Sequence, residues 1–338
     1  SGEFRLANDA ELILGKGNHK FAESNIAPIG DRRITGQGRF LIGDPSLTNP
    51  TEFPNVFIYN NLVLDPGVSV EIFSGSTTVV DTPHTITGGG RLVLDDATSG
   101  AMPPTMYLDF DLTVEGPLRI AGGSVDGEGD LFVNGPFEWT GGLLAGYTMI
   151  EVPKIVLESG ATVDNAFIGT TDGAGTTLQL DGRDLILLGG ATVYDGRLEF
   201  GQSAKMEIGD SGATGSSAVL NVQNDPAIGM TFAASDANAG LGYGVFNYGA
   251  IAGSGLLTFE SSILGNFPAP EFGNTAAIAP GNETPGALLF DVENYDHLDG
   301  ELQVNFLGTA TGEWDKMEVT GPVNLGGVLA VDLDFTPQ

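Results

Sequence analysis

The sequence predicts an all-β fold made of many short strands, and three observations support this prediction. Apolar residues almost nowhere recur at the i, i+3, i+4 spacing of an amphipathic helix. Short runs of β-branched and aromatic residues, such as 56–59 and 68–72, lie between glycines, and glycine makes up 51 of the 338 residues. Asp-Gly, a pair that favours turns, begins at residues 126, 172, 181, 195 and 299. The chain is therefore expected to alternate strands and tight turns from end to end.

A nine-residue phrase occurs four times and indicates that these strands stack. Its pattern is apolar-x-Gly-x-Gly-x-apolar-x-apolar, and its copies are ITGQGRFLI from Ile34, ITGGGRLVL from Ile86, VDGEGDLFV from Val125 and IAGSGLLTF from Ile251. The starts lie 52, 39 and 126 residues apart, which suits several coils of about 20 residues with variable loops. A solenoid stacks such coils because a single coil cannot bury its own apolar face. We therefore predict a single right-handed parallel β-helix, a β-solenoid, with Leu131 inside.

The Gly-x-Gly of this phrase has a second interpretation as part of a dinucleotide-binding loop. That fingerprint needs a third glycine that opens a helix, whereas here each pair of glycines runs into an apolar strand. A tight corner between strands is the favoured interpretation. The longest uncharged run, 237–259, contains six glycines and is expected to form strands rather than a membrane helix.

Two stretches resemble bacterial exported β-helix surface proteins of the autotransporter-passenger type. Residues 124–146, SVDGEGDLFVNGPFEWTGGLLAG, are similar to a phrase common in large surface β-helix proteins. Residues 279–290, APGNETPGALLF, resemble the PGNxPG phrase of the passengers with one extra residue, and LGGVLAV from Leu325 is similar to the LGGxLxV of their last coils. The resemblance implies a non-enzymatic adhesin or passenger-type stalk, located outside the cell or on the bacterial cell surface, with glycans or cell-surface molecules as partners.

The domain boundaries follow from these stretches. Residues 1–4, Ser-Gly-Glu-Phe, look like a cloning scar and are left out of the expected fold. Residues 5–287 are expected to form parallel β-helix coils. Residues 288–338 are expected to form the C-terminal coils or the cap of the same solenoid.

The charge balance excludes several classes of partner and chemistry. The chain carries 44 acidic and 13 basic side chains, a net charge of −31. Phosphate binding needs clustered Lys and Arg, so we expect no nucleic-acid partner and no binding to anionic membranes. A strongly acidic surface keeps a protein soluble, and we expect a monomer in solution. Cysteine is absent, which excludes disulfides, thiolate zinc sites and a cysteine nucleophile.

Carbohydrate cleavage is the alternative function, because many parallel β-helices are polysaccharide lyases or glycosidases. Such enzymes need two carboxylates about 5–10 Å apart. The candidate pairs are Asp95 with Asp96, Asp109 with Asp111 on one strand face, and Asp181 with Asp184. With 44 carboxylates such pairs arise readily by chance, and His19, His84 and His297 are expected at the surface or in turns. We therefore assign no catalytic residue and expect the protein not to be an enzyme.

Calcium is the one cofactor for which the sequence offers candidate ligands, because hard cations prefer carboxylate oxygens. Asp126, Glu128 and Asp130 share one glycine-supported turn that would aim three carboxylates at one ion, and Asn294, Asp296 and Asp299 form a second cluster. The competing interpretation is that these are solvated turn acids and that the protein holds no cofactor.

Aromatic residues offer a possible site for sugar stacking. Tyr243, Phe246 and Tyr248 lie in a glycine-rich stretch where exposure would let them stack on sugars. Core packing is the favoured role for most phenylalanines, including Phe40, Phe132, Phe200, Phe259 and Phe290.

Overall fold

The computed structural model is all-β in the residues it describes, which confirms that prediction. These residues are 3–14, 18–21, 32–43, 55–58, 61–73, 76–80, 83–95, 103–145, 154–157, 161–163, 178–189, 191–193, 196–201, 204–209, 218–223, 230–234, 244–260, 271–274, 277–281, 286–291, 295–297, 301–307, 313–320 and 323–333. They contain no helix long and apolar enough to cross a membrane. The chain divides into two compact units, 1–159 and 160–338, which we describe separately.

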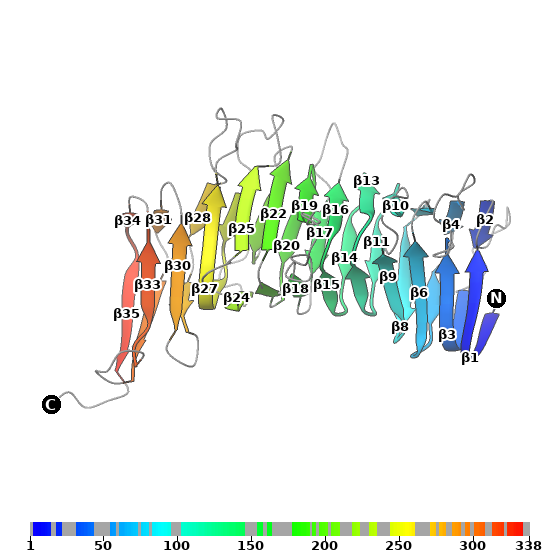
Figure 1. Ribbon diagram of the computed structural model, residues 1–338, viewed down its shortest axis with the longest axis horizontal. Helices are drawn as coiled ribbons and strands as arrows, with labels where there is room; N and C mark the ends of the chain where they lie inside the picture. Colours follow the sequence, from blue (N-terminus) through cyan, green and yellow to red (C-terminus); the bar gives the residue numbers. More distant parts are fainter. Residues whose placement is uncertain are drawn as a thin grey trace, which may run out of the picture. The chain divides into compact units, whose positions relative to one another are not determined.

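Unit 1 (1–159) consists of three ladders of parallel strands (Figure 1). The first ladder contains β1 (Glu3–Leu14), β3 (Arg32–Ile42), β5 (Leu62–Leu64), β8 (His84–Gly88), β11 (Leu112–Val114), β14 (Leu131–Val133) and β17 (Lys154–Leu157). The second contains the later halves of β1 and β3, then β6 (Val68–Phe73), β9 (Arg91–Asp95), β12 (Leu118–Ile120) and β15 (Phe137–Trp139). The third contains β2 (Asn18–Phe21), β4 (Asn55–Ile58), β7 (Thr77–Val80), β10 (Thr105–Leu108), β13 (Ser124–Gly127) and β16 (Gly142–Ala145).

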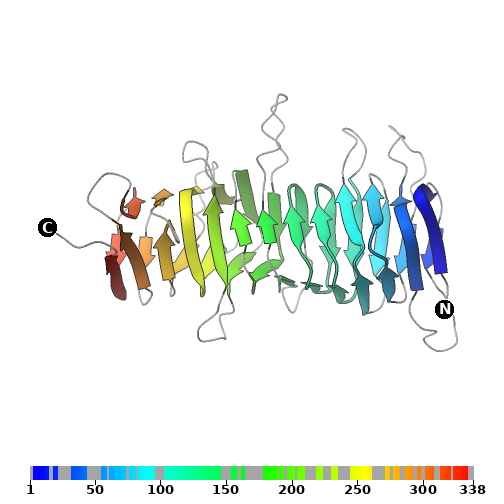
Figure 2. The ribbon, with the colours of Figure 1, turned by 90° about the horizontal axis from the view of Figure 1, so that it is seen from below.

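Unit 2 (160–338) has three ladders of the same kind, and Figure 2 shows their strands side by side. The first contains β20 (Asp184–Leu187), β23 (Lys205–Ile208), β26 (Gly244–Asn247), β28 (Glu271–Asn274), β31 (Tyr295–His297) and β34 (Val323–Leu325). The second contains β18 (Ala161–Val163), β21 (Ala191–Val193), β24 (Val219–Gln223), the start of β27 (Ala250–Glu260), β29 (Ala277–Pro280), β32 (Glu301–Phe306) and β35 (Val328–Leu333). The third contains β19 (Leu178–Asp181), β22 (Gly196–Gly201), β25 (Met230–Ala234), the end of β27, β30 (Ala287–Asp291) and β33 (Lys316–Val319).

Within each unit the chain visits the ladders in the order first, second, third, and we call one such passage a circuit. Each strand therefore pairs with the equivalent strand of the next circuit rather than with its neighbour in sequence. Between β10 and β13 the offset is 19 residues, since Thr105 pairs with Ser124. In the uncharged run 237–259, residues 244–259 are described and contain β26 and most of β27, which confirms the expectation of strands for that part, while 237–243 lie outside the described residues.

Alternation of inward and outward side chains builds the core. Leu131 and Val133 of β14 are fully buried, while Phe132 between them is only partly buried and faces outward. The inward position of Leu131 is thus confirmed. The core assignment of Phe132 is wrong, because neighbouring residues of a strand point to opposite faces. The other four phenylalanines expected in the core are confirmed there: Phe40, Phe200, Phe259 and Phe290.

Aromatic rings stack in the interior of the third ladder of unit 2. The ring centroids of Phe200 and Phe232 lie 6.2 Å apart, and those of Phe232 and Phe259 lie 5.0 Å apart. Phe232 pairs directly with Phe259 in the ladder. Because the parallel strands stack in register, a position that faces the core in one circuit also faces the core in the next.

The recurring phrase forms corners between ladders, as predicted. Its first glycine is Gly36, Gly88, Gly127 or Gly253, and each has φ between +97° and +106°. A Cβ atom there would lie only 1.9–2.3 Å from the carbonyl oxygen of the residue paired beneath it in the preceding circuit. These positions tolerate glycine alone, because a side chain would have both a strained backbone and no space.

The same phrase serves all three kinds of corner. Gly36 and Gly88 lie between the first and second ladders, Gly127 lies between the third and first, and Gly253 lies between the second and third. The irregular spacing of the phrase follows from this, since it encodes a corner and not a fixed position in the circuit.

Two of the four residues expected to form a cloning scar, Glu3 and Phe4, are part of the fold. Glu3 and Phe4, expected to belong to a scar outside it, begin β1 and pair with Arg33 and Ile34. The Phe4 ring packs edge-on against Phe40 at 6.3 Å between centroids.

We predict that Leu131→Asp destabilises the protein far more than Phe132→Asp. The first substitution buries an unpaired charge between stacked strands, at a cost of several kcal/mol, while the second places it at the surface. Thermal unfolding followed by circular dichroism should show a melting temperature lowered by more than about 5 °C for Leu131→Asp alone. Equal losses in the two variants would contradict the inward register of β14.

Candidate functional site

The most distinctive chemical feature of unit 1 is a stack of two acidic turns. Residues 109–111 connect β10 to β11, and residues 128–130 connect β13 to β14 one circuit later. The strands on both sides are in register, so the second turn lies directly on the first. We call the five carboxylates of these turns and of the adjoining strand end the acidic corner: Asp109, Asp111, Asp126, Glu128 and Asp130.

Backbone hydrogen bonds hold the two turns together. The Gly129 amide donates to the Leu108 carbonyl at 2.9 Å, and the Leu112 amide donates to the Asp130 carbonyl at 2.9 Å. Gly129 has no room for a side chain, because its Cβ would lie 2.2 Å from the carbonyl oxygen of Phe110. The second glycine of the phrase thus permits the close stacking that brings the carboxylates of two circuits to one corner.

The structure corrects the expected placement of Asp109 and Asp111. Both were expected on one face of a strand, but β10 ends at Leu108 and β11 begins at Leu112. Both aspartates are exposed in the bend between them. The strands are short because the chain must turn three times in each circuit, and the polar Asp-Phe-Asp segment supplies the turn.

Asp126 belongs to strand β13, and only Glu128 and Asp130 lie in the turn that follows it, so the three expected calcium ligands do not share one turn and do not converge. The Asp126 carboxylate accepts a hydrogen bond from the Gly127 amide at 2.7 Å, and Glu128 is exposed. The Asp130 amide donates to the Asp111 carboxylate at 3.0 Å. Across the described part of the chain, no group of three or more His, Asp or Glu side chains is arranged to hold a metal ion.

Of the second candidate metal cluster, Asp296 is part of β31, in which only the backbone is described. Asn294 and Asp299 lie outside the described residues.

The negative charge of the acidic corner acts on a tyrosine of the third ladder. Tyr107 of β10 pairs with Asp126 of β13. Burial raises the pKa of the Tyr107 phenol above its usual value, and the charges of Asp109, Asp126 and Glu128 raise it further. The three carboxylates that add to this rise also create a negative potential, which attracts cations.

The other two carboxylate pairs have different surroundings. Asp95 ends β9, and Asp96 lies outside the described residues. Asp181 and Asp184 flank Arg183, whose side chain is completely buried, and the Asp184 carboxylate accepts a hydrogen bond from the Lys205 amide at 2.9 Å. The sequence-based expectations did not include Arg183. Its position between two Asp residues is the only feature of the sequence that points to a buried arginine there.

One histidine departs from the expectation of a surface or turn position. His84 is a buried residue of β8, 7% exposed, and pairs with Leu112. Its inward position follows from the alternation of the strand, since Ile86 of β8 is also buried. His19 and His297 are part of β2 and β31, in which only the backbone is described.

The candidate sugar-stacking residues are partly covered. Phe246 and Tyr248 are half-buried, and Tyr243 lies outside the described residues. The Lys205 ammonium lies 5.6 Å from the centre of the Phe246 ring, so a cation already occupies one of its faces. Burial and the charge of Glu207 raise the pKa of Tyr248.

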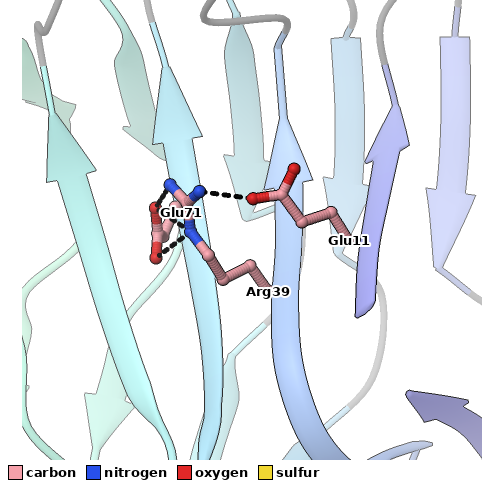
Figure 3. A network of polar contacts seen from close by, with 3 residues as sticks. All are labelled: Glu11, Arg39 and Glu71. Atoms are coloured by element: carbon pink, nitrogen blue, oxygen red, sulfur yellow. Dashed lines mark hydrogen bonds and ion pairs between the residues drawn. The ribbon is translucent and has the colours of Figure 1, made fainter. Parts of the chain in front are cut away.

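An ion network across three circuits has no counterpart in the sequence-based expectations. Arg39 of β3 lies between Glu11 of β1 and Glu71 of β6, as Figure 3 shows. Its Nε atom is 3.0 and 3.1 Å from the two carboxylate oxygens of Glu71. The partners are 28 and 32 residues away in the chain, so no local motif could reveal them.

This network shifts the ionisation of its members. Burial alone would raise the pKa of Glu71, but hydrogen bonds from Arg39 and Ser69 and the charges of Arg39 and Arg91 outweigh it, so the pKa is lowered. The hydrogen bond to Glu71 raises the pKa of Arg39, which stays fully protonated. Because the Arg39 side chain is 43% exposed, solvent screens part of the attraction.

We predict that Glu71→Gln lowers the melting temperature at pH 7 by about 2–4 °C, because the hydrogen-bonded carboxylate stabilises the fold. A lowered folded pKa contributes stability above the unfolded value, 4.5, and loses it as pH falls through the folded pKa. The difference from wild type should therefore shrink below about pH 4. Glu318→Gln, which removes an exposed pair with Lys316, is the matched control and should change little.

We also predict that calcium at about 5 mM raises the melting temperature by about 1–3 °C beyond sodium of equal ionic strength. Cations that bind carboxylates of the folded form stabilise it by mass action, whereas sodium only screens. Asp126→Asn with Asp130→Asn should remove part of the excess, while Asp291→Asn with Asp332→Asn should keep it. If calcium and sodium act alike, the acidic corner is a set of solvated turn acids.

Comparison with known proteins provides no family assignment. No protein-family model matches the chain, and no curated protein or solved structure is significantly similar to it. Function must therefore be inferred from the residues and their geometry.

Proposed function

We propose that this chain is a right-handed parallel β-helix that acts as a non-enzymatic exported surface protein of bacteria, an adhesin or a passenger-type stalk. The observation that supports this most is the three-ladder circuit. In each ladder the apolar side chains of successive strands stack on one another in the interior, and polar side chains face outward. Right-handed connections are the rule for parallel strands of one sheet. Stacked circuits of this kind present a long, regular surface, which is what a stalk or adhesin uses.

The C-terminal segments support the proposed relationship to passenger-type proteins. Most of the APGNETPGALLF phrase maps onto β29, the corner that follows it and β30, and Gly281 within that corner has φ of +80°. The later segment of the resemblance, LGGVLAV from Leu325, begins at the last residue of β34 and continues into β35. The phrase therefore lies at a corner of the circuit, where a conformation restricted to glycine is needed.

The charge distribution supports an exposed, extracellular role. Unit 1 has 9 basic and 21 acidic residues, a net charge of −12, and unit 2 has 4 basic and 23 acidic residues, a net charge of −19. Among the described ladder pairs no carboxylate lies directly opposite another. Stacking of like charges is thus avoided while the surface stays strongly acidic, which favours solubility.

A carbohydrate-active enzyme is the second proposed function. One observation supports it: Tyr107 lies close enough to three carboxylates of the acidic corner, those of Asp109, Asp126 and Glu128, for their charges to raise its pKa. Aromatic rings beside paired carboxylates are the groups that glycosidases use.

We predict that the labelled protein binds a subset of neutral glycans on an array, with calcium and without it, and releases no reducing sugar from them. Binding is expected because neutral sugars meet no repulsion from the acidic surface. A reducing-end assay on each bound glycan is the measurement of turnover. If reducing sugar accumulates with the wild type but not with the double variant Asp109→Asn, Glu128→Gln, the protein is an enzyme and the adhesin proposal is wrong.

A further inference from the structure

The outward face of the first ladder in unit 2 carries two aromatic rings on one short segment. Phe246 belongs to β26 and Tyr248 directly follows that strand, and both residues are half-buried. Asn247 between them is completely buried. Because successive residues of an extended chain point to opposite faces, the two rings face outward together, about 7 Å apart along the chain. One pyranose ring with its substituents can span that distance.

Hydrogen bonds fix the backbone that carries these rings. The Asn247 side-chain amide donates to the Ala277 carbonyl at 3.1 Å, and the Asn247 side-chain oxygen accepts a bond from the Gly249 amide at 3.2 Å. The Tyr248 amide donates to the Ile208 carbonyl at 2.8 Å. The segment is thus tied to the circuit before it and to the circuit after it. A ligand that binds the two rings therefore has little of the protein to order.

The two faces of the Phe246 ring have different surroundings. The Lys205 ammonium, from β23 of the preceding circuit, lies 5.6 Å from the centre of the ring. In the following circuit the residue paired with Phe246 is Gly273. Since glycine has no side chain, this ladder position places nothing over the ring from that side. A sugar ring can lie there with its C–H groups against the aromatic face.

The polar groups beside the rings match the hydroxyl groups of a sugar. Glu207 pairs with Phe246 in the ladder and is half-buried on the same outward face. Burial and the charge of Glu207 raise the pKa of Tyr248, so its phenol stays protonated and can donate. No hydrogen bond joins the Tyr248 hydroxyl to another described residue. A carboxylate that accepts and a phenol that donates complement sugar hydroxyls, which do both.

We propose that Phe246, Tyr248 and Glu207 form a binding site for one neutral pyranose ring of a glycan. The sugar stacks on the face of Phe246 opposite Lys205, and its hydroxyls bond to the Tyr248 hydroxyl and the Glu207 carboxylate. The charges directly beside the ring are one cation, Lys205, and one carboxylate, Glu207, and this balance favours a neutral ligand over an ionic one. The site rests on the proposed glycan-binding function and assigns that function to one place in unit 2.

The test measures the affinity of the full chain and its variants for the neutral glycans that the wild type retains on the array. Phe246→Ala should weaken binding at least about tenfold, because the stacking surface is lost. Tyr248→Phe removes one hydroxyl and should weaken binding about threefold to tenfold. Phe132→Ala is the matched control, because Phe132 is also a half-buried, outward phenylalanine of a first ladder, and this variant should bind like wild type.

The outcomes separate this site from the function on which it rests. A wild type that retains no neutral glycan overturns both the site and the glycan-binding function. A wild type that binds, together with a folded Phe246→Ala that binds equally well, overturns the site alone. Circular dichroism checks folding, and Tyr248→Phe, which keeps the ring in place, gives the answer if Phe246→Ala does not fold. Hexagalacturonate is the acidic probe, and binding as tight as that of the neutral glycans would overturn the preference for a neutral ring.

Discussion

The structure depends on how closely the backbones of successive circuits approach at the corners. At Gly88 the carbonyl oxygen of Leu64 occupies the place that a Cβ atom would need, and Gly127 has the same relation to Leu108. Strands of a sheet lie about 4.8 Å apart, so a turn can stack on the next turn only where no side chain intervenes. Glycine at these positions therefore sets the vertical register of all three ladders. The apolar columns inside, and the positions of charges outside, follow from that register.

In-register stacking restricts where an acidic protein can place its charges. Carboxylates directly opposite each other on neighbouring strands would repel at short range. The described strands place Glu3 opposite Arg33, Glu11 opposite Arg39 and Arg119 opposite Glu138, and the remaining acids of the described ladder pairs lie opposite uncharged residues. Further acids lie in the turns, such as Asp109, Asp111, Glu128 and Asp130 of the acidic corner, where water screens the exposed ones. The buried apolar side chains stabilise the ladders, and the charged side chains in the turns help to keep the surface hydrated.

The sequence predicts the strands and the corners well because both depend on local residue patterns. Leu131 and the glycines of the recurring phrase occupy the predicted positions. Phe132 does not, because within a three-residue strand of Leu, Phe and Val only the register decides which residues face inward. Arg39 and Glu71 could not be paired from the sequence either. Their distance along the chain, 32 residues, combines one circuit with a loop whose length varies from circuit to circuit.

The scarcity of cations in unit 2 limits what its surface can bind. Its four basic residues are all described, and none is a solitary cation at the surface. Arg183 is buried, Lys205 lies over the Phe246 ring, and the other two, Arg197 and Lys316, pair with Glu199 and Glu318. An anionic ligand would therefore meet 23 carboxylates with no cation left to compensate for them. This charge balance suits the neutral glycans that we propose as partners better than it suits acidic polysaccharides.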